Sequence, residues 1–128
     1  VRQALVEIAH VKPDRIAEIT GALDLAARAA VADAFNGRDA DPLTGDPEVA
    51  PAYDVVIGTD AMAEGVNLQR RTCAVHHLDL PWEPGALKQR NGRGVRQGNT
   101  LGIVGVRYYV SVGSLDMKRK DTIVGKTA

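Results

Sequence analysis

Residues 53–58 read YDVVIG, a short and strongly apolar run that decides the fold class. Apolar runs of this length without polar alternation are typical of strands that are buried on both faces of a parallel sheet. Three other segments have strand character, namely RIAEIT (15–20), TCAVHHLDL (72–80) and LGIVGVRYYV (101–110). We expect one parallel sheet whose central strands include Val55–Ile57, Ala74–Leu78 and Ile103–Val106.

Segments with helical character separate these strands. Residues 1–10 have apolar residues at helical spacing and precede Pro13, which ends the predicted helix. Asp24 can cap an alanine-rich helix over residues 23–35, with Leu25, Ala29 and Ala32 at supporting spacing. PGALKQRNGRGVRQ (84–97) can begin a helix at Pro84. Alternating strands and helices predict an α/β fold with helices on the faces of a parallel sheet.

The composition predicts one globular domain over residues 1–128. Hydrophobic residues make up 45% and charged residues 25%, and no apolar stretch is long enough to span a membrane. A single cysteine, Cys73, excludes an internal disulfide; we expect it to be a small core residue and the compartment to be reducing. No signal peptide is evident, and Val1 in place of a methionine suggests a fragment of a longer protein.

Charge is unevenly distributed although the formal net charge is zero. Residues 36–51 combine prolines, glycines and acids without periodicity, so we expect an exposed and poorly ordered loop. Residues 86–98 contain one lysine and three arginines and no acid. Any contact with a polyanion must therefore be local.

The basic segment QRNGRGVRQG (89–98) is the strongest candidate for a binding site. If residues 86–97 are helical, Gln89, Arg93 and Arg96 share one face, and their guanidiniums form an array suited to phosphate oxygens. A solvated basic face is the alternative. Gly92 and Gly94 favour binding, because each costs a helix roughly 1 kcal/mol and permits close approach of a backbone or ligand.

Other chemistries are disfavoured. GRGVRQG lacks the preceding strand of a dinucleotide fingerprint, which argues against an oxidoreductase domain. His76 and His77 lie on opposite faces of a strand and cannot share one metal ion, so we predict structural roles for both and no metal site.

With TDAMAEGVNLQ (59–69) added, the pattern resembles the C-terminal RecA-like lobe of superfamily-two helicases and translocases. It looks closest to chromatin-remodeller-like and phage or plasmid helicases. Residues 53–69 are similar to motif V of that group, DLPWEP (79–84) to the segment after the next strand, and residues 89–96 to motif VI. The resemblance covers roughly residues 15–110 and implies a RecA-like three-layer sandwich with a mostly parallel central sheet.

The resemblance also implies roles for individual residues. Arg93 and Arg96 would be arginine fingers that reach the γ-phosphate of ATP, and Gln89 would help to place the attacking water or that phosphate. Glu64, Gly65 and Asn67 would bind the nucleotide, and Thr59 would contact the nucleic-acid backbone. Arg90, about 100° round the helix from Gln89, should tolerate substitution better.

The partners that the resemblance implies lie outside this chain. ATP and Mg would be bound mainly by a missing N-terminal lobe, because no P-loop and no Asp-Glu dipeptide occur here. The expected function is therefore the second motor lobe of an ATP-dependent helicase or translocase in the cytoplasm of a prokaryotic or phage-like system. DNA is expected as the track more than RNA. The alternative is a non-catalytic nucleic-acid-binding module with the same fold.

Overall fold

The computed structural model describes residues 1–59, 66–79, 84–95, 97–109 and 118. The chain divides into two compact units, Val1–Leu68 and Gln69–Ala128. Each unit contains one parallel pair of strands and at least one helix. No helix in the described ranges has the length and apolar content that crossing a membrane requires. A single domain over residues 1–128 stays a prediction.

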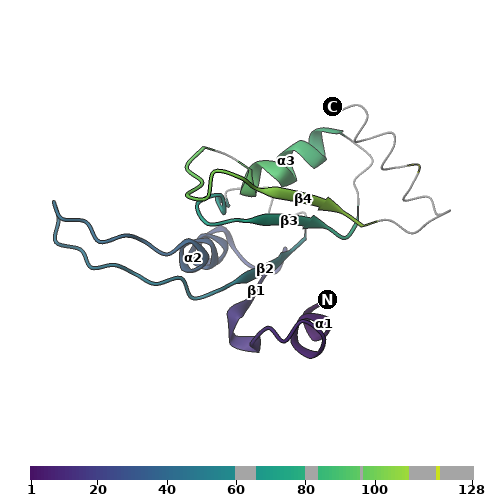
Figure 1. Ribbon diagram of the computed structural model, residues 1–128, viewed down its shortest axis with the longest axis horizontal. Helices are drawn as coiled ribbons and strands as arrows, with labels where there is room; N and C mark the ends of the chain where they lie inside the picture. The colour runs from purple at the N-terminus through teal and green to yellow at the C-terminus, as the bar shows by residue number, and fades with distance from the viewer. Residues whose placement is uncertain (60–65, 80–83, 96, 110–117, 119–128) are drawn as a thin grey trace. The chain divides into compact units, whose positions relative to one another are not determined.

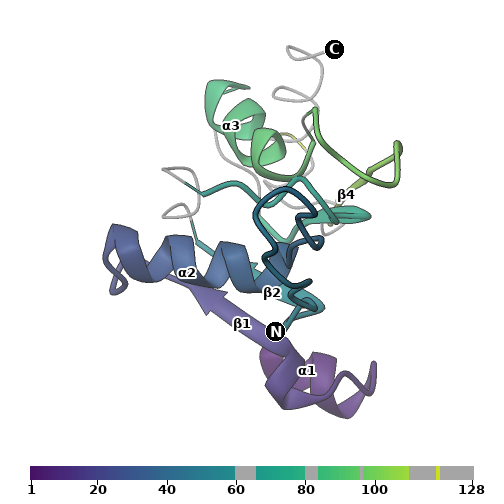
Figure 2. The same ribbon diagram turned by 90° about the vertical axis from the view of Figure 1, so that its left-hand side faces the viewer.

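The first unit is built on a two-stranded parallel sheet (Figures 1 and 2). Its elements are α1 (Arg2–Glu7), the 3-10 turn η1 (Pro13–Arg15), β1 (Ile16–Ile19), α2 (Leu25–Asn36) and β2 (Val55–Gly58). The register runs from Ile16 opposite Val55 to Ile19 opposite Gly58. The backbone N–H of Thr59 extends the pairing by donating to Ile19 O at 3.2 Å. The predicted strands at 15–20 and 53–58 are confirmed with shorter bounds.

Helix α2 begins where the sequence predicts, because Asp24 Oδ1 accepts a hydrogen bond from Ala27 N at 2.7 Å. The buried face of the helix differs from the predicted one. Leu25 and Ala29 are exposed, whereas Ala32 joins a core with Ile19, Val66 and Leu68, flanked by Val31, Phe35 and Val56. The residues that α2 gives to the core all come from its second half, so Leu25 remains exposed although it lies seven residues from Ala32 on the same face.

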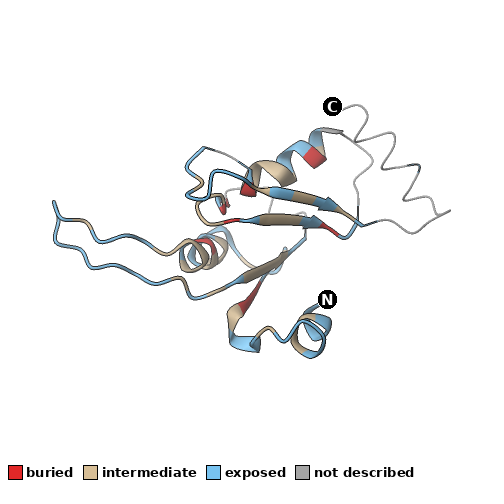
Figure 3. Cartoon of the chain, in the orientation of Figure 1, coloured by how far each residue is buried: buried red, intermediate tan, exposed pale blue. Residues whose placement is uncertain are grey.

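The acidic segment 36–51 forms an excursion whose two arms run side by side (Figure 1). Its exposure is confirmed (Figure 3), and Leu43 near the tip is 94% exposed. The segment has more local structure than expected, because Arg38 and Val49 exchange two backbone hydrogen bonds of 2.9 and 2.8 Å. Gly37 starts the excursion at φ 65°, where an added Cβ would lie 2.7 Å from Val49 O.

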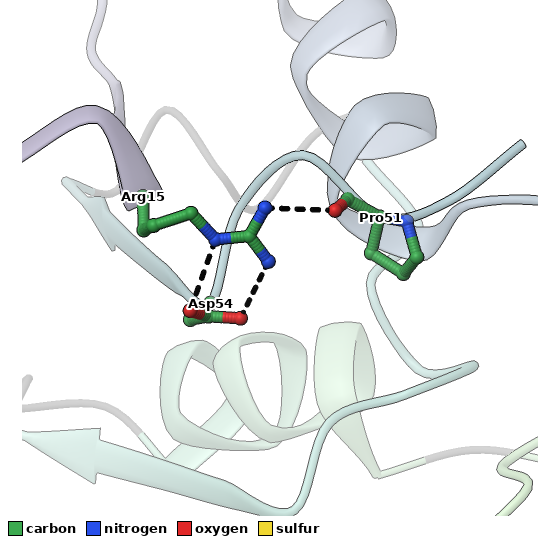
Figure 4. A network of polar contacts seen from close by, with 3 residues as sticks. All are labelled: Arg15, Pro51 and Asp54. Atoms are coloured by element: carbon green, nitrogen blue, oxygen red, sulfur yellow. Dashed lines mark hydrogen bonds and ion pairs between the residues drawn. The ribbon is translucent and has the colours of Figure 1, made fainter. Parts of the chain in front are cut away.

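A bidentate ion pair fastens the base of this excursion to the start of β1 (Figure 4). Arg15 donates from Nε to Asp54 Oδ2 at 3.0 Å and from Nη2 to Asp54 Oδ1 at 2.8 Å. Its Nη1 donates to Pro51 O at 2.9 Å. The hydrogen bonds to the Asp54 carboxylate raise the pKa of Arg15. These contacts bring together the residues that immediately precede the paired strands β1 and β2.

The second unit pairs β3 (Ala74–His77) with β4 (Gly105–Tyr108) in parallel, and α3 (Pro84–Gly94) packs on β3. The α/β class with parallel strands is confirmed. The described strands form two small pairs, and both strands of this pair are shorter than predicted. Ile103 is 81% exposed and lies outside β4, because residues 99–102 form a turn. Cys73 is exposed, so its prediction as a core residue is wrong.

Candidate functional site

Helix α3 carries two of the predicted catalytic residues on the side away from its buried face. Leu87 (1% exposed), Asn91 and Gly94 form what we call the buried face, at positions i, i+4 and i+7. At 100° per residue, Gln89 and Arg93 lie 200° and 240° from Leu87. Gln89 is exposed and Arg93 is half-buried. We call these two residues the outer face of α3.

The helix is shorter than predicted. α3 ends at Gly94, and Val95 N donates to Asn91 O at 2.7 Å before the chain turns. The continuation of the helix to Gln97 is therefore wrong. Gly98 follows at φ 95°, a conformation that a helix cannot contain. Arg96 lies outside the described residues, so its place on the outer face stays a prediction.

Gly92 and Gly94 of α3 have different surroundings. A Cβ added at Gly94 would lie 2.8 Å from Val75 Cγ2 and 2.9 Å from Thr72 Cγ2, whereas a Cβ at Gly92 would meet nothing within 4 Å. Gly94 is therefore explained by close packing of α3 on the start of β3, not by a ligand. Only Gly92 keeps the interpretation that the sequence suggested for both glycines.

Arg90 has a structural role that its sequence position did not reveal. Its Nη1 donates to Asp79 O at 2.9 Å and lies 3.4 Å from Asp79 Oδ1. Arg90 is half-buried, and it ties α3 to the segment that follows β3. The expectation that Arg90 tolerates substitution is therefore not supported by its contacts.

A buried histidine links β3 to the buried face of α3. His77, 4% exposed, shares a hydrogen bond of 2.6 Å between its Nε2 and Asn91 Oδ1. Its ring stacks on Tyr108 of β4 with centroids 5.2 Å apart. Burial lowers the pKa of His77, although the bond to Asn91 opposes this shift, so the ring is neutral and donates from Nε2. His76 is exposed and meets Tyr109 Oη at 2.7 Å, which confirms that the two histidines alternate faces.

Asn99 organises the chain beyond α3. Its Nδ2 donates to Gln69 O and Thr72 O at 2.7 and 2.8 Å, and its Oδ1 accepts from Leu101 N and Gly102 N at 2.8 and 2.9 Å. One amide side chain thus joins the loop before β3 to the turn before β4. The only sequence signal is the turn-forming pair Gly98–Asn99, which does not identify its distant partners.

The predicted motif V residues belong to the first unit. Thr59 is exposed at the end of the β1–β2 pair, and Asn67 is exposed between buried Val66 and Leu68. Asn36 Nδ2 donates to Asn67 O at 2.8 Å, which ties this backbone to the end of α2. Glu64 and Gly65 lie outside the described residues. Both ends of the segment between Thr59 and Asn67 are therefore anchored in the first unit.

No group of three His, Cys, Asp or Glu side chains that could hold a metal ion occurs within the described part of the chain. In the expectation from the sequence, Mg and the phosphates of ATP are held mainly by another lobe.

Comparisons with known proteins identify the family. Residues 3–98 match the model of the helicase conserved C-terminal domain, and the chain belongs to this family. The resemblance to the C-terminal RecA-like lobe of superfamily-two helicases is thereby confirmed.

Two individual proteins are similar to parts of the chain. The defense against restriction protein B of Escherichia phage P1 is 43% identical over 72 residues, which are 56% of this chain and 3% of that protein. The crystal structure of the C-terminal part of the Fun30 ATPase domain matches 94% of this chain and 34% of that one, with a TM-score of 0.67 and 19% identity. The second likeness supports the RecA-like fold. This chain spans a small part of both proteins.

Proposed function

We propose that the chain is the second motor lobe of an ATP-dependent helicase or translocase and acts on ATP that an N-terminal lobe of the same polypeptide holds. The observation that carries the proposal is the outer face of α3, where Gln89 and Arg93 lie opposite the face that packs on β3. A helix held from one side can present the other side to a phosphate without losing its packing. The matching family supports the assignment.

Hydrolysis of ATP requires positive charge near the transferred phosphoryl group, where negative charge develops in the transition state. Arg93 and Arg96 would donate charge-assisted hydrogen bonds to the γ-phosphate oxygens, and Gln89 would orient the attacking water or that phosphate. Mg, held mainly by the N-terminal lobe, would neutralise charge on the β- and γ-phosphates. The guanidinium of arginine keeps its proton throughout, so the fingers act by charge and position alone.

The motif V segment would serve the same cycle from the first unit. Glu64, Gly65 and Asn67 would line the ribose side of the nucleotide, and Thr59 would donate to a phosphate of the nucleic-acid track. The anchored ends of this segment support such a role. We take DNA as the track and the cell interior as the location; the name of the phage P1 relative, which refers to defence against restriction, supports this choice.

The test uses the full-length polypeptide that contains this chain. Arg93→Ala and Arg96→Ala should each lower the turnover number for ATP at least a hundredfold, with much smaller changes in ATP affinity. Lys88→Ala is the matched control, because it removes an exposed cation from the same helix, 100° from Gln89. It should leave turnover unchanged.

The alternative, a non-catalytic nucleic-acid-binding module, predicts the opposite pattern. In that case Arg93→Ala would leave ATP turnover at its original value and weaken DNA binding, with a smaller dependence of affinity on salt. Measuring DNA affinity at several salt concentrations for the same variants therefore separates the two functions.

A further inference from the structure

The partly buried hydrogen bond between His77 and Asn91 lies on the side of α3 opposite its outer face. Asn91 is two residues after Gln89 and two residues before Arg93, so its backbone position determines where both of their side chains begin. The partner ring is fixed in turn, because Tyr108 stacks on it from the neighbouring strand with planes 11° apart. His77 thus offers Asn91 a rigid and buried donor.

A second close contact lies three residues further along the same face. Gly94 has no room for a Cβ against Val75 and Thr72, so the helix backbone touches β3 there. Two contacts on one side of a helix, nearly one turn apart, oppose rotation of the helix about its axis. At about 5–6 Å from that axis, a rotation of roughly 20° would move an outer side chain by about 2 Å.

We infer that His77 and Asn91 are positioning residues for Gln89 and Arg93. The hydrogen bond sets the rotation of α3 on β3 and so aims the outer face, without either residue touching the nucleotide. This inference rests on the proposed function for its effect on turnover, since a displacement near 1 Å at a reacting group can cost about a hundredfold in rate. The inference also states that this hydrogen bond keeps α3 ordered, and this second statement does not depend on the proposed function.

The variants remove the hydrogen bond while keeping side chains of similar shape, so the effect of the bond is tested alone. His77→Phe keeps a ring that can stack on Tyr108 but removes the donor, and Asn91→Leu keeps a similar size but removes the acceptor. His77→Gln retains an N–H donor and should rescue. His76→Phe is the matched control, because it makes the same change at the exposed neighbour on the other face of β3.

Two readouts are taken on the full-length polypeptide. In His77→Phe and Asn91→Leu, the turnover number for ATP should fall about tenfold or more with little change in KM. Amide hydrogen exchange in residues 88–94 should accelerate relative to the unsubstituted protein, and it should accelerate more than exchange in β1 and α2 of the same molecule. His77→Gln should recover most of both properties, and the double variant His77→Phe/Asn91→Leu should lose no more than the worse single variant.

Each outcome decides the inference. Unchanged exchange in α3 of His77→Phe overturns it, and so does faster exchange together with unchanged turnover when Arg93→Ala is strongly impaired. If Arg93→Ala itself leaves turnover intact, the proposed function fails separately. Faster exchange confined to α3, with rescue by glutamine, then still supports the positioning of the helix by His77 and Asn91.

Discussion

Gly92 and Gly94, two of the three glycines of α3, permit a stability experiment within a single helix. Gly94→Ala would place a Cβ 2.8 Å from Val75 Cγ2 and 2.9 Å from Thr72 Cγ2, distances that a real Cβ does not reach without movement. Gly92→Ala would place the same atom in open space two residues earlier. The two substitutions have the same chemistry and differ in what the added methyl group meets.

The expected magnitudes follow from these contacts. Alanine in place of glycine inside a helix stabilises by up to about 1 kcal/mol, so Gly92→Ala should raise the free energy of unfolding by an amount of this order. At Gly94 the same gain is opposed by overpacking, which costs about 1–3 kcal/mol because both neighbours are short β-branched side chains. The free energy of unfolding of Gly92→Ala should therefore exceed that of Gly94→Ala by about 1–3 kcal/mol.

Urea denaturation of the 128-residue chain, followed by far-ultraviolet circular dichroism, measures this difference between the two variants. Equal free energies of unfolding, or a more stable Gly94→Ala, would refute the reasoning that α3 needs a glycine to pack on β3. Hydrogen exchange locates the effect, because strain at Gly94 should accelerate exchange in α3 and β3 and leave α2 unchanged.

Two further predictions concern the second unit. Asn99→Ala removes four hydrogen bonds to the backbone and should lower the free energy of unfolding by about 2 kcal/mol or more, whereas Gln97→Ala at an exposed neighbour should change it little in the same urea titration. Because burial lowers the pKa of His77, the unfolded chain binds a proton near pH 6.5 that the folded chain does not, so stability is complete above that pH and falls below it. Arg90 adds to this lowering of the pKa, and Asp79 and Asn91 oppose it. Melting temperatures between pH 7 and 5 should therefore fall less in His77→Gln than in His76→Gln, and equal slopes would contradict the assignment.

Signals that act over a few residues were sufficient to predict the elements of the fold. Asp24 caps α2 as expected, since its acceptor and the N–H of Ala27 are three residues apart. The apolar run before Gly58 forms β2 as predicted, but Val55, Val56 and Ile57 are half-buried and Gly58 is exposed, so the predicted burial on both faces is not observed. The same reasoning predicted the side of α3 on which Gln89 and Arg93 lie together.

Contacts between residues that are distant in the sequence explain where the predictions from the sequence were wrong. Ile103 belongs to an apolar run, but Asn99 bonds to a loop some thirty residues earlier and holds the following residues in a turn. Gly94 has to be a glycine because Val75 leaves no room for a Cβ there. Val75 lies nineteen residues before Gly94 and is brought close only by the crossover from β3 to α3. Neither separation leaves a periodic trace in the sequence, because these partners meet through the topology.

The arginines of the segment that contains α3 have different roles. The guanidinium of Arg90 binds Asp79, so the charge of Arg90 stabilises the second unit itself. The phosphate-facing charge in the proposed function is therefore that of Arg93 and Arg96 alone, with Gln89 as the neutral partner. Changes on the buried face should lower turnover by moving the helix, whereas changes on the outer face should lower turnover by removing the groups that meet the nucleotide. If Arg93→Ala keeps its folded structure and its full turnover number for ATP, the assignment of the outer face to the nucleotide has to be abandoned.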